Sequence, residues 1–404
     1  MYSRSLAQTL EQYGNFPVIA ILGPRQSGKT TLVQSFFSKH TFVSLENPMT
    51  REFAESEPKK FLETYENEHG IILDEFQYVP HLLSYIQLDV DSKKRKSYFI
   101  LTGSQNFLMN QAITQSLAGR VGLLTLLPLS LGELIQNDLV SGSIEDVLFR
   151  GSYPRLYNEQ FTPERLYPSY IHTYVERDVR QLVHVGDLHT FQKFLQLCAA
   201  RIGNLLNLSD LAMVCGISVP TAKRWISTLE ASYILFLLEP HYKNFNKRVT
   251  KMPKLYFYDT GLACSLLRIA SPKQLALHPS YGSLFENFIL SDIVKQYSNL
   301  GLRPSINFWR DKNGRVEIDC LISEGGKLFP IEIKSSPEIK PDFFKGLQQW
   351  SSIRQAAEPD QSSSQAFLVY GGEEKQQRMQ GKALPWKTTA HIVEEIRKEN
   401  EYGL

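Results

Sequence analysis

Short apolar runs recur through the first third of the chain, and segments with helical spacing separate them. After the first run, Leu32, Val33, Phe36 and Phe37 fall on one helical face. Continuous apolar runs are typical of parallel strands that are buried on both faces. We therefore expect a doubly wound parallel sheet. Its strands are expected at residues 17–22, 41–45, 71–74, 97–102 and 123–127.

The middle of the chain changes to helical spacing, which is densest between residues 164 and 202. A short helix, Asp210–Val214, is expected with Ser209 as its N-cap, and Gly216 then turns the chain. A second helix is expected over Val219–Ala231, capped by Ser218, and an apolar run at 233–238 follows as a strand. Helix, glycine turn, helix and strand form the layout of a winged helix.

The last third predicts a helix at 281–296, three strands, a helix at 341–353 and a fourth strand at 366–370. The three strands are expected at 307–310, 315–322 and 327–334. The Asn313-Gly314 pair between the first two is a strong hairpin signal. This order, α-β-β-β-α-β, resembles the core of restriction-endonuclease-like domains.

Composition narrows the class of protein. The 404 residues include 42% hydrophobic and 21% charged residues, as in an ordinary folded chain, and the net charge of +2 argues against a histone-like polybasic binder. The four cysteines are scattered, which indicates reduced thiols. No signal segment or apolar run of membrane-spanning length is recognisable, so we expect a cytoplasmic protein without a membrane partner. Its expected domains are 1–140, 141–270 and 271–404.

The strongest chemical motif lies between the first strand and the first helix. Residues 23–30 read G-x-x-x-x-G-K-T, the phosphate-binding loop of nucleoside triphosphatases. Lys29 can reach the β- and γ-phosphates, and the Thr30 hydroxyl can bind Mg²⁺. We therefore expect ATP and Mg²⁺ as cofactors. The expected nucleotide contacts are Gly23, Pro24, Arg25, Gln26, Ser27, Gly28, Lys29, Thr30, Thr31 and Ser104.

Carboxylates follow the strand at 71–74, where open α/β sheets bind ligands. Asp74 is expected to support Mg²⁺, and Glu75 to orient the attacking water. Ser104, at the end of the next strand, is interpreted either as a sensor of the γ-phosphate or as a helix cap. Arg120 is interpreted either as a catalytic arginine, acting within one chain or across a subunit interface, or as a surface arginine.

The second helix of the winged-helix pattern carries polar residues on one side. Thr221, Lys223 and Arg224 fall away from the apolar stripe and are candidate DNA contacts. Two basic residues make a small footprint for DNA. Packing of this unit against the rest of the protein or against a protein partner is the alternative interpretation.

The C-terminal pattern contains the residues expected of a nuclease. Glu332 and Lys334 lie two apart on one strand and so share a face, with Asp319 on the preceding strand. Asp319 and Glu332 are candidate ligands of a second Mg²⁺, and Glu286 completes the candidate site. Ile318 replaces the proline of the motif's common form. An inactive domain that only binds a partner is the alternative.

Several strings together resemble AAA-type ATPases: the phosphate loop, Leu73-Asp74-Glu75, Leu101-Thr102-Gly103-Ser104 and Leu117-Ala118-Gly119-Arg120. In particular, the chain is similar to uncharacterised prokaryotic AAA-family ATPases that carry a C-terminal domain of unknown function. The resemblance implies ATP binding and hydrolysis and is compatible with a homo-oligomer. We predict an ATPase that acts with or on nucleic acid, DNA being favoured. The alternative is a nucleotide-dependent switch whose C-terminal domain binds a protein partner.

Overall fold

The computed structural model describes residues 2–402 except 94, 105–112, 114–115, 159–160, 176–187, 242–251, 312 and 358–363. Its N-terminal part is a five-stranded parallel sheet in the order β2-β3-β4-β1-β5. This confirms the predicted fold class. The strands are β1 (Val18–Gly23), β2 (Thr41–Ser44), β3 (Ile71–Asp74), β4 (Phe99–Ser104) and β5 (Val121–Thr125).

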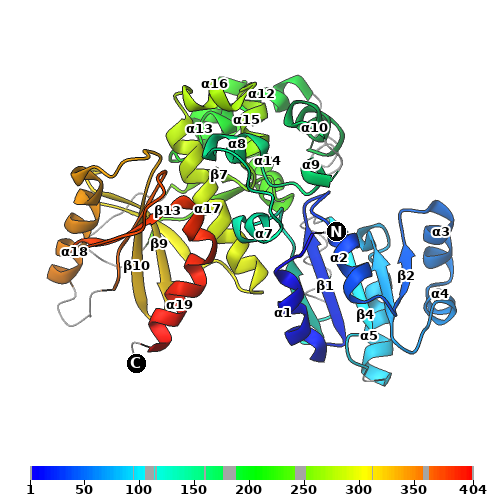
Figure 1. The fold of residues 1–404 in the computed structure, drawn as a ribbon. Coiled ribbons are helices and arrows are strands. Elements are labelled where there is room, and N and C mark those ends of the chain that lie inside the picture. The colour runs from blue at the N-terminus through cyan, green and yellow to red at the C-terminus, as the bar shows by residue number, and fades with distance from the viewer. Residues whose placement is uncertain are drawn as a thin grey trace.

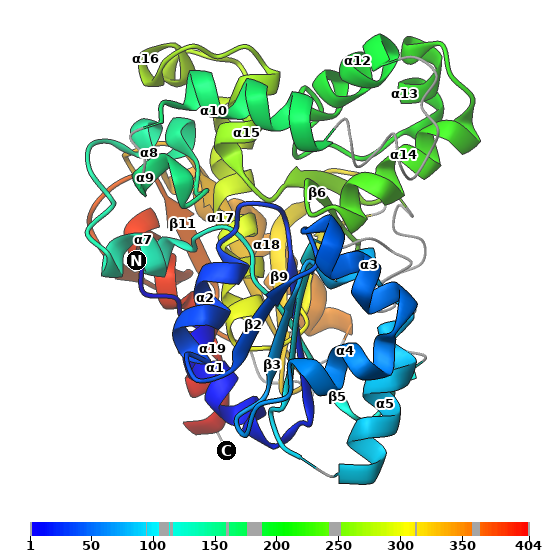
Figure 2. The same cartoon turned by 90° about the vertical axis from the view of Figure 1, so that its right-hand side faces the viewer.

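Alternate residues of β1 enter the two cores that cover this sheet. Ile19 and Ile21 pack with α1 and α2, whereas Val18, Ala20 and Leu22 belong to the core under α4 and α5. Figure 2 shows the two groups of helices on opposite sides of the sheet. The helices of this part are α1 (Leu6–Gln12), α2 (Lys29–Phe36), α3 (Pro48–Ser56), α4 (Pro58–Thr64) and α5 (Leu82–Lys93).

A helical region follows, above both sheets in the view of Figure 1. The helix over Val219–Ala231 has the predicted bounds, and Ser218 caps it by accepting from Thr221 N. The predicted cap Ser209 is wrong, because Asn207 accepts from the first amides of α13 and the helix begins one residue before Ser209. The helices are α7 (Leu131–Gln136), α8 (Ile144–Arg150), α9 (Arg155–Asn158), α10 (Pro163–Tyr170), α12 (Leu188–Ala199), α13 (Leu208–Cys215), α14 (Val219–Ala231), α15 (Thr260–Leu266) and α16 (Pro272–Ala276). An antiparallel pair, β6 (Leu235–Leu238) and β7 (Lys254–Phe257), completes the region.

The C-terminal part is a mixed six-stranded sheet in the order β12-β13-β11-β10-β9-β8. The predicted succession from helix 281–296 to strand 366–370 is present. A hairpin that the sequence pattern did not predict follows, and the chain then forms a last helix around the helix-like run at residues 394–398. The elements are α17 (Tyr281–Asn299), β8 (Ile306–Arg310), β9 (Glu317–Glu324), β10 (Lys327–Lys334), α18 (Lys345–Ala357), β11 (Phe367–Tyr370), β12 (Gln376–Arg378), β13 (Gly381–Pro385) and α19 (Ile392–Tyr402).

The helical region and the C-terminal sheet share one hydrophobic core, which extends from Leu127 to Ile396. Main-chain hydrogen bonds between residues 239–241 and Phe308 also join β6 to the edge strand β8. The C-terminal end of α17 reaches the N-terminal part, because Thr9 on α1 donates to the Asn299 carbonyl at 2.6 Å. The predicted division at residue 270 remains a prediction. Within the described ranges, no helix is both long and apolar enough to cross a bilayer.

Candidate functional site

The phosphate loop joins the carboxyl end of β1 to the first turn of α2. Gly23 has φ +152°, and a Cβ there would lie 2.2 Å from the Leu126 carbonyl oxygen. Gly28 has φ +95° at the start of α2. Both positions therefore require glycine, the first for space as well as for backbone conformation. The loop ends at the N-terminus of α2, and a helix N-terminus stabilises an anion.

Lys29 lies across this loop. Its ammonium group donates to the carbonyls of Gly23 and Pro24 at 3.0 and 2.8 Å, and the residue is only 5% exposed. The charge is thus held over the loop, and its contact with the β- and γ-phosphates remains a prediction. Ser27 is fully buried, and its hydroxyl donates to the Pro24 carbonyl at 3.0 Å. Thr31 is exposed on α2.

The predicted metal-binding pair lies together. The Thr30 hydroxyl donates to Asp74 Oδ1 at 2.9 Å, and the Thr102 hydroxyl donates to the same oxygen. The pairing of β4 between β1 and β3 explains this, because the carboxyl ends of the three strands meet at one edge. Thr102 was not among the predicted site residues, although its position at the end of an apolar run was the signal for it.

Glu75 follows β3 in the left-handed conformation, with φ +54°, which turns the chain sharply next to Asp74. Burial raises the pKa of the Glu75 carboxyl, while Lys29, a hydrogen bond from Gln77 and Arg25 act in the opposite direction. The Gln77 amide donates both to Glu75 and, at 3.1 Å, to Ser104 Oγ. Gln77 therefore joins two predicted residues, and it was missed because a single glutamine in a turn carries no motif.

Arg120 lies far from this edge. It precedes Val121, which pairs with Val18 at the amino end of β1, whereas the phosphate loop starts at the carboxyl end. Its guanidinium makes two hydrogen bonds to Asp91, of 2.6 and 2.9 Å. Arg120 and the phosphate loop therefore lie at opposite ends of β1. The predicted catalytic role of Arg120 within one chain is wrong for this reason. A role across a subunit interface remains a prediction.

The candidate DNA contacts lie on the outer side of α14. Lys223 and Arg224 are exposed and Thr221 is half-buried, whereas Trp225 and Ile226 on the other side are buried. Two T-shaped ring contacts, with Phe191 and Phe194 of α12, hold Trp225 in the core. The arrangement leaves the predicted polar face of this helix accessible.

The candidate nuclease residues also meet. Lys334 lies 2.7 Å from Glu332 and 3.6 Å from Asp319, and the Ile333 amide donates to Asp319 at 2.8 Å. Glu286, on α17, accepts from Tyr256 and lies 3.5 Å from Lys254. The sequence indicated four of these residues: Glu286, Asp319, Glu332 and Lys334.

Lys254 and Tyr256 were missed because they come from β7 of the helical region. Lys254 also pairs with Glu317, which itself lies 3.4 Å from Arg310. Lys254 is only 4% exposed, so its charge is enclosed among these carboxylates.

Burial and mutual repulsion change the protonation of this cluster. They raise the pKa of Glu332 to about 8 and that of Glu286 to about 7, with desolvation as the largest cause and Asp319 next. Lys334 and Lys254 neutralise part of the charge. In the part of the chain that the structure describes, no three His, Cys, Asp or Glu side chains are arranged to share a metal ion. A metal held by Asp319 and Glu332 therefore remains a prediction.

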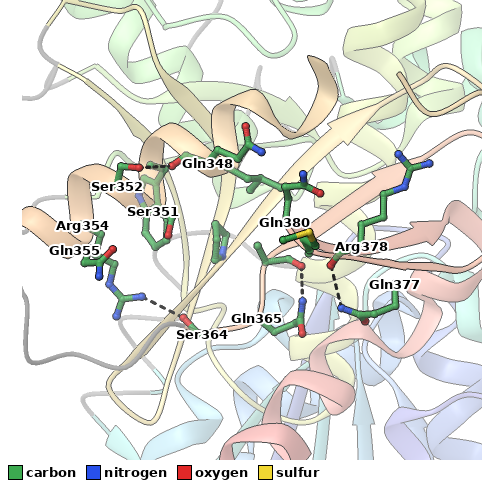
Figure 3. Close-up of a pocket in the computed structure, with 16 residues that line it drawn as sticks. Gln348, Ser351, Ser352, Arg354, Gln355, Ser364, Gln365, Gln377, Arg378 and Gln380 are labelled. Atoms are coloured by element: carbon green, nitrogen blue, oxygen red, sulfur yellow. Dashed lines mark hydrogen bonds between the residues drawn. The ribbon is translucent and has the colours of Figure 1, made fainter. Parts of the chain in front are cut away.

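A separate pocket of about 770 Å³ lies between α18 and the β12–β13 hairpin. Figure 3 shows the side chains that line it; most of its polar groups are glutamines and serines, and two arginines but no carboxylate contribute. Several of these groups bond within the wall, as in the bonds from Arg354 to Ser364 and from Gln377 to the Arg378 carbonyl. The phosphate loop is thus the better candidate site.

Three family matches divide the chain. An AAA domain matches residues 15–135, a domain of unknown function (DUF8612) matches 141–273, and a second domain of unknown function (DUF4143) matches 281–389. The AAA match contains the phosphate loop, Asp74, Glu75 and Ser104. The site geometry and this match therefore agree on the class of the N-terminal part.

Two uncharacterised proteins, one of Mycobacterium tuberculosis and one of Mycobacterium bovis, are each 29% identical over 369 residues, or 89% of this chain and 77% of theirs. The Walker-type ATPase of Pyrococcus abyssi is 17% identical, with 67% of this chain and 96% of that chain covered and a TM-score of 0.45. The RuvB Holliday junction branch migration motor of Thermotoga maritima is 15% identical, with 66% and 95% covered and a TM-score of 0.32. Because both scores are below 0.5, the assignment rests on the AAA match and the loop geometry. The chain carries an AAA-type P-loop ATPase domain followed by a C-terminal part of unknown function, and so resembles the uncharacterised prokaryotic AAA-family ATPases.

Proposed function

We propose that the chain binds ATP with Mg²⁺ at the phosphate loop and hydrolyses it. The observation that carries this proposal is the hydrogen bond of 2.9 Å from Thr30 to Asp74. It brings together a hydroxyl and a carboxylate that follow two different strands, directly beside Glu75. Oxygen donors of this kind are the ligands that Mg²⁺ prefers.

The residues present fit this cofactor. Lys29 and the loop amides would hold the phosphates, and Thr30 and Asp74 would hold the metal, directly or through water. Mg²⁺ supplies charge neutralisation on the phosphates when it is bound. Thr102 fixes one Asp74 oxygen by donating to it, so the carboxylate presents a defined orientation to the site.

Glu75 is proposed to orient and deprotonate the attacking water. Its left-handed backbone turns it away from the buried strand, and Gln77 holds its carboxylate. Because Gln77 also bonds to Ser104, a change at the end of β4 would be transmitted to Glu75. This connection supports a sensing role for Ser104.

Turnover of Mg·ATP by the full chain tests the proposal. Lys29→Ala is expected to lower ATP affinity by at least roughly tenfold and to abolish turnover, because it removes the charge over the loop. Lys59→Ala is the matched control, since that side chain is 83% exposed on α4. Equal ATP binding and turnover in both variants would contradict the proposal. Single-turnover kinetics separate it from the alternative, a switch that binds ATP without hydrolysing it.

Nucleic acid is the second proposal, and DNA is the favoured form. The exposed face of α14 with Lys223 and Arg224 supports binding, and the convergence of Asp319, Glu332 and Lys334 supports phosphodiester chemistry. Duplex DNA binding should weaken in a Lys223→Ala, Arg224→Ala double variant. Supercoiled plasmid with Mg²⁺ or Mn²⁺ tests cleavage, and equal nicking by wild type and Lys334→Ala would count against it.

The alternative to phosphodiester chemistry is that the nuclease-like domain is inactive. In that case the C-terminal part would bind a protein partner. Retained DNA binding without any cleavage would support a binding-only role.

A further inference from the structure

Arg4, before the first helix, is buried against the phosphate loop. It is 7% exposed, and its guanidinium donates to three different parts of the chain. These are the Ser27 carbonyl at 2.7 Å, the Leu127 carbonyl at 2.7 Å and Glu133 Oε1 at 3.0 Å. The guanidinium therefore ties the loop to the segment after β5 and to α7.

The bond to the Ser27 carbonyl has a consequence for the loop. A trans peptide is planar, so its C=O and N–H groups point in opposite directions. Holding the Ser27 carbonyl toward Arg4 thus turns the Gly28 N–H away from Arg4. Arg4 NH1 also lies 3.6 Å from the position of a Cβ at Gly28, so the guanidinium packs against this peptide. Phosphate loops bind anions through such main-chain N–H groups.

Arg4 and Glu133 form a buried ion pair, and further hydrogen bonds hold the Glu133 carboxylate in place. Its two carboxylate oxygens accept from Arg4, from Ser5 N at 2.8 Å and from Ser130 N at 2.9 Å, and the residue is completely buried. A buried pair with all of these bonds formed is rigid, and removal of one partner leaves an uncompensated charge. The phosphate loop is therefore attached, through Arg4, to the rigidly held Glu133 on α7.

Hydrogen bonds also connect α7 to the C-terminal part. Leu131 N, in the first turn of α7, donates to Asp292 on α17 at 2.6 Å. Figure 1 shows α7 between the sheet of β1 and the helix α17. Arg4 thus lies at one end of a series of bonded groups that runs from the phosphate loop to the C-terminal part.

We propose that Arg4 is a positioning residue for the nucleotide: it sets the direction of the Ser27–Gly28 peptide and anchors the loop to α7 through Glu133. This inference rests on the proposed ATP binding, and it assigns to Arg4 no contact with the substrate. Lysine cannot replace arginine here, because one ammonium cannot make three bonds in the planar geometry of a guanidinium.

The test compares Arg4→Lys with wild type in the full chain, by titration with a fluorescent ATP analogue and by steady-state kinetics. The matched control is Arg354→Lys, which changes another buried arginine, 6% exposed, in the C-terminal part. At a temperature where thermal melting shows all three proteins folded, Arg4→Lys should weaken nucleotide binding roughly tenfold or more and lower kcat. Arg354→Lys should stay within about twofold of wild type in both.

Each outcome has one meaning. Arg4→Lys with unchanged affinity and kcat would overturn the inference while leaving the ATPase proposal intact, and so would equal losses in both variants. A wild type that binds ATP without turnover would remove only the hydrolysis proposal, since affinity still tests Arg4. A wild type that does not bind ATP would overturn both. If Arg4→Lys does not fold, Glu133→Gln takes its place, because it weakens the same anchor and should lower affinity in the same direction.

Discussion

The Nε2 atom of Gln77 donates a hydrogen bond to Ser104 Oγ at 3.1 Å and a second bond to the Glu75 carboxylate. One amide group thus joins the turn after β3 to the end of β4, beside the phosphate loop. Glu75 is therefore positioned by a neighbour two residues away and, through it, by a strand that pairs with β1.

Removal of this amide should impair catalysis more than binding. In Gln77→Ala, the Glu75 carboxylate loses its hydrogen bond and can rotate, so we expect kcat to fall by roughly tenfold with KM for ATP nearly unchanged. Steady-state kinetics at saturating Mg²⁺ measure both. Gln87→Ala, on the surface helix α5, is the control, and a rise in KM alone would argue against this role.

The pH dependence of turnover should report Glu75. Burial raises its pKa above the ordinary value of 4.5, and the proposed water activation needs the ionised form. Turnover should therefore be lost as the pH falls, with a midpoint above 4.5. In Glu75→Gln, turnover should fall by at least roughly 10²-fold. The loss of turnover at low pH should then be absent from the pH profile of this variant. A loss that persists in the variant would assign it to another group.

Gly23→Ala should destabilise the N-terminal part. Its Cβ would lie 2.2 Å from the Leu126 carbonyl, at a backbone φ of +152°. The combined clash and strain should lower the free energy of unfolding by about 2–4 kcal/mol. Urea denaturation measures it. Gly282→Ala is the control, because a Cβ at Gly282 would lie 3.8 Å from its nearest neighbour, Ser335 Oγ. This substitution should change the free energy of unfolding by less than about 1 kcal/mol. Equal effects would contradict the argument.

The titration of Glu332 should make the folded protein less stable as the pH rises. Its pKa is about 8 in the folded chain, against an ordinary value of 4.5. Between these values the folded state keeps a proton that the unfolded state has lost, so the free energy of unfolding decreases as pH rises.

Denaturation at pH 5 and pH 8 should therefore show a larger loss for wild type than for Glu332→Gln, by on the order of 2 kcal/mol. Equal losses in the two proteins would show that the Glu332 carboxyl is ionised throughout.

The sequence predicted those features that depend on neighbouring residues. The strand–loop–helix around Lys29 and the helix over Val219–Ala231 each follow from a local pattern, and the structure has them. The cap at Ser209 was wrong because the helix begins earlier, at Leu208, where Asn207 accepts from the amides of Ser209 and Asp210.

Contacts between distant residues were not predictable in this way. Arg4 and Glu133 are 129 positions apart, and Lys254 reaches Glu286 from another part of the fold. Neither arginine nor lysine had a local signal, because such pairs depend on how the strands and helices pack. Arg120 shows the reverse case, since its motif suggested a catalytic arginine, and the strand direction excludes that role within one chain.

The helix α17 connects the N-terminal part with the carboxylates of the candidate nuclease site. Its 19 residues span about 28 Å at 1.5 Å per residue. Its carboxyl end rests on Thr9 of α1, Asp292 is bonded to α7, and Glu286 lies near the opposite end. Glu286 lies about 20 Å along the helix from Asn299, so a tilt of about 2° at the supported end would displace it by about 0.7 Å, enough to break or form a hydrogen bond. Such a tilt would therefore change the contacts that Glu286 makes with Lys254 and Tyr256.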